Sequence, residues 1–195
     1  MKVKQVFLVM LLLITIRSVG QNTESSIREL YNNMLTRVKD MRAGEYPASL
    51  VDLTLKRNLS GSGPQAVKQT ICFVDDYDYE TSTQTLQTQF VTLSYNYAAR
   101  QYYEEYLYDE DENLVFAYCR HSKDDMSGMF EVRIYLDKNE VFTLLVKEKK
   151  EGEKQYTQTY KGSKITPEYT DIVNSLKATG KENTELLKNI YKTLK

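Results

Sequence analysis

The sequence contains no tryptophan, a single histidine, two cysteines and three prolines, and these scarcities exclude several kinds of protein. Two cysteines and one histidine fall short of the four ligands that a structural zinc site requires. Three prolines and eight glycines are too few for long disordered linkers. Because tryptophan is absent, the aromatic floor of any sugar-binding cleft has to be built from tyrosine.

The N-terminal apolar run is too short to cross a bilayer. Residues 6–16 are apolar and uncharged, but Arg17 ends them well before the roughly 20 residues that a membrane-spanning helix requires. Lys2 and Lys4 give the segment a positive start, which is typical of a secretory signal.

Small residues follow this run and mark a cleavage site. Ser18 and Gly20 occupy the −3 and −1 positions of a cut before Gln21, which is the pattern that signal peptidase reads. We therefore predict a signal peptide over residues 1–20. The mature protein is then exported, periplasmic or extracellular, with no transmembrane segment. An N-terminal anchor that stays attached is the alternative.

Charge is nearly balanced after cleavage. Removing residues 1–20 takes away three basic residues and no acidic ones, which leaves 23 basic and 27 acidic residues. The net charge of −4 lacks the basic excess that a phosphate backbone requires, so we expect no nucleic-acid partner. Residues 21–195 are enough for one domain with a core and too few for two, so we predict a single domain.

The cysteines, Cys72 and Cys119, both fall in strand-like segments. A disulfide between them is one interpretation, because the protein is bound for an oxidising compartment. Two buried thiols that act as small apolar side chains are the other. The sequence leaves both open, since pairing requires Cα atoms within about 7 Å of each other.

Apolar residues at spacings of three and four predict an amphipathic helix over residues 24–42. Ser26 and Glu29 have the spacing of a capping box, and Gly44 is a stop signal beyond the last turn. Both ends of the helix are therefore marked.

Residues 45–66 lack a clear period, and we expect a connector there with one short helical turn around residues 50–55. Period-two runs rich in β-branched and aromatic residues follow, and they predict strands. The predicted strands are 67–74, 87–97, 101–108, 113–120, 129–137 and 140–147, with a seventh candidate at 154–160.

Thr166 and Pro167 predict the start of a C-terminal helix. Gly180 interrupts it, so residues 166–194 form either one kinked helix or two. Helix, strands and helix in this order predict the α+β class. We expect an antiparallel β-meander of about six strands whose apolar face packs against an N-terminal and a C-terminal helix.

Tyrosine is unusually frequent, at 16 residues. Rows of tyrosine on a strand can present a flat amphipathic surface to a glycan or a protein. The alternative is that the rings pack beneath the helices. The candidate ligand-binding residues lie on two successive predicted strands: Tyr95, Tyr97, Tyr102, Glu104, Tyr106 and Tyr108.

A family resemblance rests on two segments: YNYAARQYYEEYLYD at residues 95–109, running on to residues 114–116, and NLSGSGPQ at residues 58–65. The chain resembles a family of uncharacterised exported proteins of Bacteroides-type bacteria over most of its mature length. The resemblance implies the exported compartment and the fold, and it implies no activity. Related chains often have glycine in the hairpin turn where this one has Glu112.

Cys119 and His121 lie on one side of a strand, which is the spacing of a thiolate and imidazole pair. A polar loop histidine is the simpler interpretation.

Asp109, Asp111 and Asn113 are spaced like the first ligands of a calcium loop. That loop lacks its glycine and its bidentate glutamate, so we predict an acidic turn and no metal.

A second acidic group comprises Asp75, Asp76, Asp78 and Glu80. These residues could cleave a glycosidic bond only from within a sugar-binding cleft.

We predict no catalytic residues and no cofactor, and we favour a non-enzymatic binding module whose tyrosine-bearing sheet face binds an envelope protein or a glycan. A carboxylate-dependent glycan hydrolase is one alternative. A small inhibitor or immunity-type protein that acts through one protruding loop is the other.

Overall fold

The computed structural model describes residues 22–44, 49–59, 63–97, 100–123 and 127–194. The predicted signal peptide lies outside these residues. In chain order the described elements are α2 (Glu24–Ala43), β1 (Leu50–Leu59), β2 (Gly63–Asp78), β3 (Thr83–Tyr97), β4 (Arg100–Tyr108), β5 (Leu114–Ser122), β6 (Gly128–Asp137), β7 (Glu140–Lys150), β8 (Thr157–Gly162) and α3 (Pro167–Leu194).

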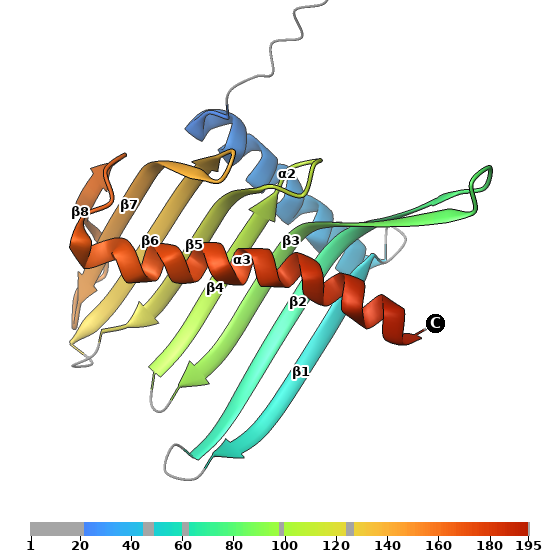
Figure 1. Cartoon of the computed structure of the whole chain (residues 1–195). Helices are drawn as coiled ribbons and strands as arrows, with labels where there is room; N and C mark the ends of the chain where they lie inside the picture. The colour runs from blue at the N-terminus through green and yellow to red at the C-terminus, as the bar shows by residue number, and fades with distance from the viewer. Residues whose placement is uncertain (1–21, 45–48, 60–62, 98–99, 124–126, 195) are drawn as a thin grey trace, which may run out of the picture.

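The strands form one antiparallel sheet in which each strand pairs with its neighbours in the chain, from β1 at one edge to β8 at the other (Figure 1). Short connections favour such a meander, because tight turns join antiparallel neighbours. Lys138 and Asn139, between β6 and β7, both have positive φ, as a type I′ hairpin turn requires. The predicted α+β class is confirmed, and the sheet has eight strands where about six were expected.

The additional strands lie at the two edges of the sheet. Residues 50–55 were predicted as a helical turn, and that prediction was wrong, because they begin β1. β1 pairs with β2 along its whole length, from Leu50 opposite Cys72 to Leu59 opposite Gly63. The seventh candidate strand is present as β8, at Thr157–Gly162.

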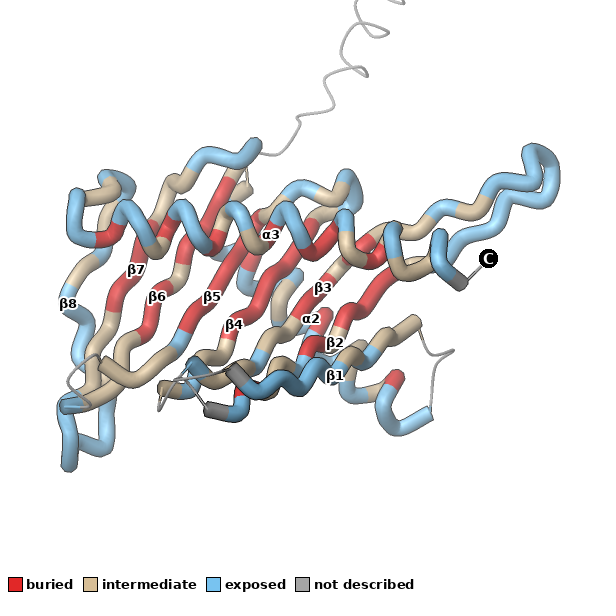
Figure 2. Tube along the Cα trace, turned by 60° about the horizontal axis from the view of Figure 1, so that its bottom comes forward, coloured by how far each residue is buried: buried red, intermediate tan, exposed pale blue. Residues whose placement is uncertain are grey.

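The two helices lie on opposite faces of the sheet, α3 in front and α2 behind in the view of Figure 1. Each face therefore has its own core. Ile134 of β6 packs in the core that contains Leu187 of α3, and Phe90 of β3 packs in the core that contains Ile27 of α2. The expectation of one apolar face was wrong, because the central strands are buried on both sides (Figure 2).

α2 begins with a capping box one turn earlier than predicted. The hydroxyl of Thr23 accepts a hydrogen bond from the Ser26 backbone N–H at 3.1 Å, and the Ser26 hydroxyl accepts from the Thr23 N–H at 3.0 Å. The pair is therefore Thr23 with Ser26, and the predicted pairing of Ser26 with Glu29 was wrong. Gly44 is confirmed as the stop, with a left-handed φ of 81° that glycine adopts without strain.

α3 is one continuous helix, which settles the ambiguity at Gly180. A Cβ atom at this position would lie 2.7 Å from Cδ2 of Leu114, so glycine permits a close approach of helix and sheet. The hydroxyl of Tyr108 also donates to the Gly180 carbonyl at 2.7 Å. Glycine weakens a helix by about 1 kcal/mol relative to alanine, and these contacts offset that cost.

The two cysteines are free thiols in different cores. Cys72 lies on the α2 side, 3.9 Å and 3.8 Å from the sulfurs of Met34 and Met41, and Cys119 lies on the α3 side. The sheet separates them, so the structure contains the buried thiols and not the disulfide. Burial raises the pKa of both thiols, which favours their protonated forms.

β2 and β3 continue beyond the rest of the sheet as a hairpin (Figure 1). β1 pairs with β2 only as far as Cys72, and β4 pairs with β3 only from Phe90, so residues 75–86 pair with each other alone. We call this segment the β2–β3 arm. Its tip carries Tyr77 and Tyr79, which are 45% and 87% exposed and contact each other edge to face.

Candidate ligand-binding face

Three of the six predicted ligand-binding residues are buried. Tyr106 and Tyr108 are 0% and 3% exposed, and Glu104 is 7% exposed. Tyr106 donates its hydroxyl to Glu104, while Tyr108 donates to α3. These side chains form part of the core beneath α3, where little of their surface is accessible to a ligand.

The other three predicted residues are at least partly accessible. Tyr95 stacks on Tyr102 with ring centroids 4.8 Å apart, and Tyr102 stacks on His121 at 5.1 Å. Phe130 continues this row on β6, 5.2 Å from His121. Tyr97, at 59% exposed, lies beyond the row. Cross-strand stacking of this kind stabilises a sheet, and it occupies the ring faces that a ligand would need.

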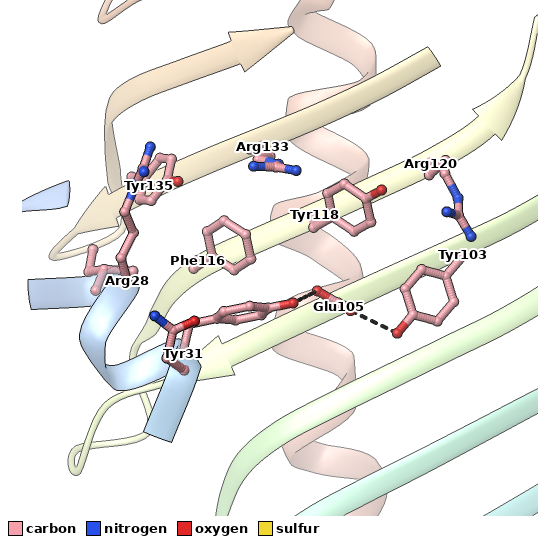
Figure 3. Close-up of a pocket in the computed structure, with 11 residues that line it drawn as sticks. Arg28, Tyr31, Tyr103, Glu105, Phe116, Tyr118, Arg120, Arg133 and Tyr135 are labelled. Atoms are coloured by element: carbon pink, nitrogen blue, oxygen red, sulfur yellow. Dashed lines mark hydrogen bonds between the residues drawn. The ribbon is translucent and has the colours of Figure 1, made fainter. Parts of the chain in front are cut away.

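The opposite face of the sheet carries a cavity of about 410 Å³ between α2 and strands β4 to β6 (Figure 3). Strand register places two rows of polar and aromatic side chains in or beside this cavity. The first row is Tyr103, Arg120 and Glu131, and the second is Glu105, Tyr118 and Arg133. Each arginine therefore has a tyrosine as its neighbour in the row, and Glu131 contacts Tyr118 of the other row. We call this the Arg–Tyr cavity.

The carboxylates of these rows are buried and hydrogen-bonded. Glu105 accepts hydrogen bonds from the hydroxyls of Tyr31 at 2.6 Å and Tyr103 at 2.7 Å. Glu131 accepts from Tyr118 at 2.9 Å and lies 3.5 Å from the guanidinium of Arg133. Both carboxylates are 8% exposed. Buried charges of this kind persist only when they are paired, as these are.

The arginines lie over aromatic rings. The guanidinium of Arg120 lies 5.5 Å from the centre of the Tyr103 ring, and that of Arg133 lies 5.4 Å from the Tyr118 ring. Arg28 of α2 reaches the Tyr135 side chain from the other side of the cavity (Figure 3). A cation–π contact holds a guanidinium by its face, so the N–H groups that no carboxylate occupies can donate to a ligand.

The tyrosine hydroxyls of the cavity stay protonated and act as hydrogen-bond donors. Burial raises the pKa of Tyr31, Tyr103 and Tyr118, and the carboxylate that each phenol contacts raises it further. Ionised phenols would lie beside a negative charge in a partly dry site, so they stay protonated. The tyrosines therefore remain hydrogen-bond donors to Glu105 and Glu131.

The exposed charge beside the Arg–Tyr cavity is positive. Arg120 is exposed and the Arg133 side chain is 34% exposed, whereas the neighbouring carboxylates are buried. Lys147 lies opposite Glu131 on β7, and the Lys149 ammonium lies over the Tyr156 ring. A chain with net charge −1 thus presents cations along one uncovered stretch of sheet.

No family model, curated protein or solved structure matches this chain. The family resemblance inferred from residues 95–109 therefore stays a prediction. Of the described helices, neither α2 nor α3 has an apolar stretch long enough to cross a bilayer.

The structure does not assemble a nucleophile from Cys119 and His121. Burial, and then the charge of Glu104, raises the pKa of the Cys119 thiol, which opposes formation of a thiolate. His121 directs Nδ1 to the Ser122 carbonyl at 2.7 Å, and its ring is part of the aromatic row.

The two predicted acidic groups lie in a turn and on an exposed hairpin. Asp109 accepts hydrogen bonds from the backbone N–H groups of Asp111 at 3.0 Å and Asn113 at 2.8 Å, which is the pattern of an Asx turn. In the described parts of the chain, no group of three or more acidic, histidine or cysteine side chains could hold a metal ion. The acidic residues 75, 76, 78 and 80 are all exposed on the β2–β3 arm, whereas a glycosidase holds its carboxylates within a sugar-binding cleft.

Sequence reasoning missed the Arg–Tyr cavity because its residues come from α2 and three strands. A partial signal was present, since Glu131, Arg133 and Tyr135 share the polar side of β6. The residues that α2 contributes to the cavity, Arg28 and Tyr31, lie some 75 residues upstream of Glu105. Nothing in the local sequence indicates that α2 packs on the same face of the sheet as Glu105.

Proposed function

We propose that this protein is an exported, non-enzymatic binding module that holds an anionic ligand in the Arg–Tyr cavity. One observation carries the proposal: Arg120 and Arg133 lie over tyrosine rings at the cavity, while the carboxylates beside them are buried and already hydrogen-bonded. Guanidinium groups bind carboxylate, sulfate or phosphate in bidentate geometry, and tyrosine rings add flat apolar area. The volume of about 410 Å³ falls within the usual size of small-ligand sites.

The carboxylates favour binding over hydrolysis. A glycosidase needs two carboxyl groups directed at the scissile bond. The two carboxylates nearest this cavity, Glu105 and Glu131, are engaged by hydrogen bonds from tyrosines and are only 8% exposed. Their arrangement supports a role in positioning tyrosine and arginine for recognition.

Replacing Arg133 by glutamine should weaken binding of an anionic sugar about tenfold. A charge-assisted hydrogen bond contributes roughly 1.5–3 kcal/mol, and about 1.4 kcal/mol corresponds to a factor of ten in affinity. Calorimetric titration of the mature protein with galacturonate, and with neutral galactose for comparison, measures the effect. Galactose should bind weakly to both proteins.

Arg42→Gln is the matched control, because Arg42 is also a partly exposed arginine paired with an acid, Asp52, at 3.1 Å. It lies at the far end of α2 and should leave galacturonate binding unchanged. Equal binding by wild type and Arg133→Gln, or no binding of galacturonate by either, would contradict the proposal.

A second candidate function is inhibition of a partner enzyme through the β2–β3 arm. The observation that favours it is the arm itself, which projects from the sheet and exposes Tyr77 and Tyr79 beside four acidic residues (Figure 1). Exposed tyrosines supply contact area at low entropic cost because each has only two side-chain torsions.

This second candidate predicts that Tyr77→Ser with Tyr79→Ser abolishes retention of an envelope enzyme that wild type retains and inhibits. Because both rings are solvent-exposed, the free energy of unfolding should change by less than about 0.5 kcal/mol. Affinity recovery from the envelope fraction, followed by an activity assay of the recovered enzyme, measures it. Retention of the same enzyme by the double variant would exclude the arm as the contact.

A further inference from the structure

A second cavity adjoins the Arg–Tyr cavity on the same face of the sheet. Its volume is about 540 Å³, and Tyr103 and Arg120 line both cavities. Register places Lys68, Ser94, Tyr103 and Arg120 in one continuous row across β2 to β5. The two cavities are therefore neighbours on either side of the stacked Arg120 and Tyr103 pair.

The pair of cavities is long compared with a single sugar or carboxylate. Neighbouring strands lie about 4.8 Å apart, so the four steps from Arg133 on β6 to Lys68 on β2 span roughly 19 Å. Positive groups occur along this span, at Arg133, Arg120 and Lys68. A ligand that reached all of them would be an extended molecule with more than one negative charge.

The second cavity adds neutral hydrogen-bonding groups to these cations. Ser94 and Gln101 are exposed, and neither side chain makes a hydrogen bond to another described residue. Asn96 is fixed between the Ala66 N–H at 2.8 Å and the Pro64 carbonyl at 3.0 Å. A hydroxyl and an amide beside the Tyr103 ring match the hydroxyls and the apolar ring faces of a sugar.

The backbone of this surface is not open to a peptide. Strands β2 to β6 each pair with a strand on both sides, so their N–H and C=O groups are already engaged. Peptides that bind sheets usually do so by adding a strand at a free edge. Recognition here has to come from side chains, and the exposed Ser94 and Gln101 beside the Tyr103 ring favour a glycan over an acidic peptide.

We infer that the two cavities form one groove for an extended acidic oligosaccharide, with charged groups recognised by Arg133, Arg120 and Lys68 and hydroxyls recognised by Ser94 and Gln101. This inference rests on the proposed function and adds the ligand class and its direction across the sheet. The first charged unit occupies the Arg–Tyr cavity, and later units pass over Tyr103 towards β2.

The test titrates the mature protein with galacturonate monomer, dimer, tetramer and hexamer. Affinity should rise at least tenfold from monomer to tetramer and then level off once the groove is filled. Lys68→Ala and Gln101→Ala should each weaken tetramer binding several-fold and leave monomer binding unchanged. Both residues are exposed, so loss of folding does not complicate these variants. Gln158→Ala, an exposed glutamine on β8, is the matched control and should bind every length as wild type does.

The outcomes separate this inference from the proposed function. Equal affinity for monomer and tetramer, with Arg133→Gln still weakening both, would overturn the groove and keep the anionic site. Absence of binding at every length would overturn both. Polyglutamate that bound as tightly as the hexamer, with the same dependence on Lys68 and Gln101, would overturn the assignment to a glycan.

Discussion

Replacing Glu104 by leucine should lower the free energy of unfolding by about 3 kcal/mol and leave ligand binding intact. Glu104 accepts hydrogen bonds from Tyr106, which is fully buried, and from Tyr95 at 2.8 Å. Leucine fills the space but offers no acceptor, so two hydroxyls lose a charged partner. A buried donor left unsatisfied costs roughly 1–3 kcal/mol. Urea denaturation followed by circular dichroism measures the change.

A double-mutant cycle with Tyr106→Phe tests the mechanism. Phenylalanine removes the donor, so Glu104→Leu combined with Tyr106→Phe should cost clearly less than the two single changes added together. Tyr97→Phe, at a 59% exposed ring, should be neutral and serves as the control. A Glu104→Leu protein of wild-type stability that failed to bind ligand would instead make Glu104 a ligand contact.

The sequence predicts the centre of the sheet well and its edge poorly. In β6, Val132, Ile134 and Leu136 alternate with polar residues, and local alternation is enough to identify the strand. β1 also alternates, but its apolar residues are only half-buried and Leu55 is 58% exposed. β1 is paired on one side only and buries little apolar surface, so the local pattern before Gly61 and Pro64 was taken for a helical turn.

The sequence of β5 already indicated that the helices lie on opposite faces of the sheet. Residues 115–119 are buried without interruption, and apolar side chains point to both faces of this strand. Such a continuous apolar run indicates a strand covered on both sides. Treating one face as core led to the expectation that both helices lie together, and it also left the separation of Cys72 and Cys119 unforeseen.

The candidate site could be predicted only in part. Tyrosine abundance indicated an aromatic surface, but burial depends on where α3 crosses the sheet, and α3 covers Tyr106 and Tyr108. The adjacent residues Tyr103 and Glu105 point to the other face and line the cavity. A single strand thus supplied tyrosines to both faces, and the choice between them required the position of α2.

The buried tyrosines should make the protein unfold steeply in alkali. Burial raises the pKa of Tyr106 and Tyr108, with the charge of Glu104 adding to the effect at Tyr106. Above about pH 10 the unfolded chain loses these phenolic protons while the folded protein keeps them. The unfolded state then binds fewer protons, so stability falls as pH rises. Each phenol contributes a slope of at most about 1.4 kcal/mol per pH unit.

Urea titrations between pH 9 and pH 11.5, with tyrosinate absorbance recorded in parallel, measure this slope. Tyr108→Phe removes one of the titrating groups, so the slope should become shallower by about one such increment even though the variant also loses the bond to Gly180. Tyr97→Phe, at an exposed ring, should leave the slope as it is in wild type. Tyrosinate absorbance that rose to completion near pH 10 while the circular dichroism stayed native would show that the core phenols ionise in the folded protein. In that case the hydrogen bond of Tyr108 to Gly180 would not be holding α3 against the sheet.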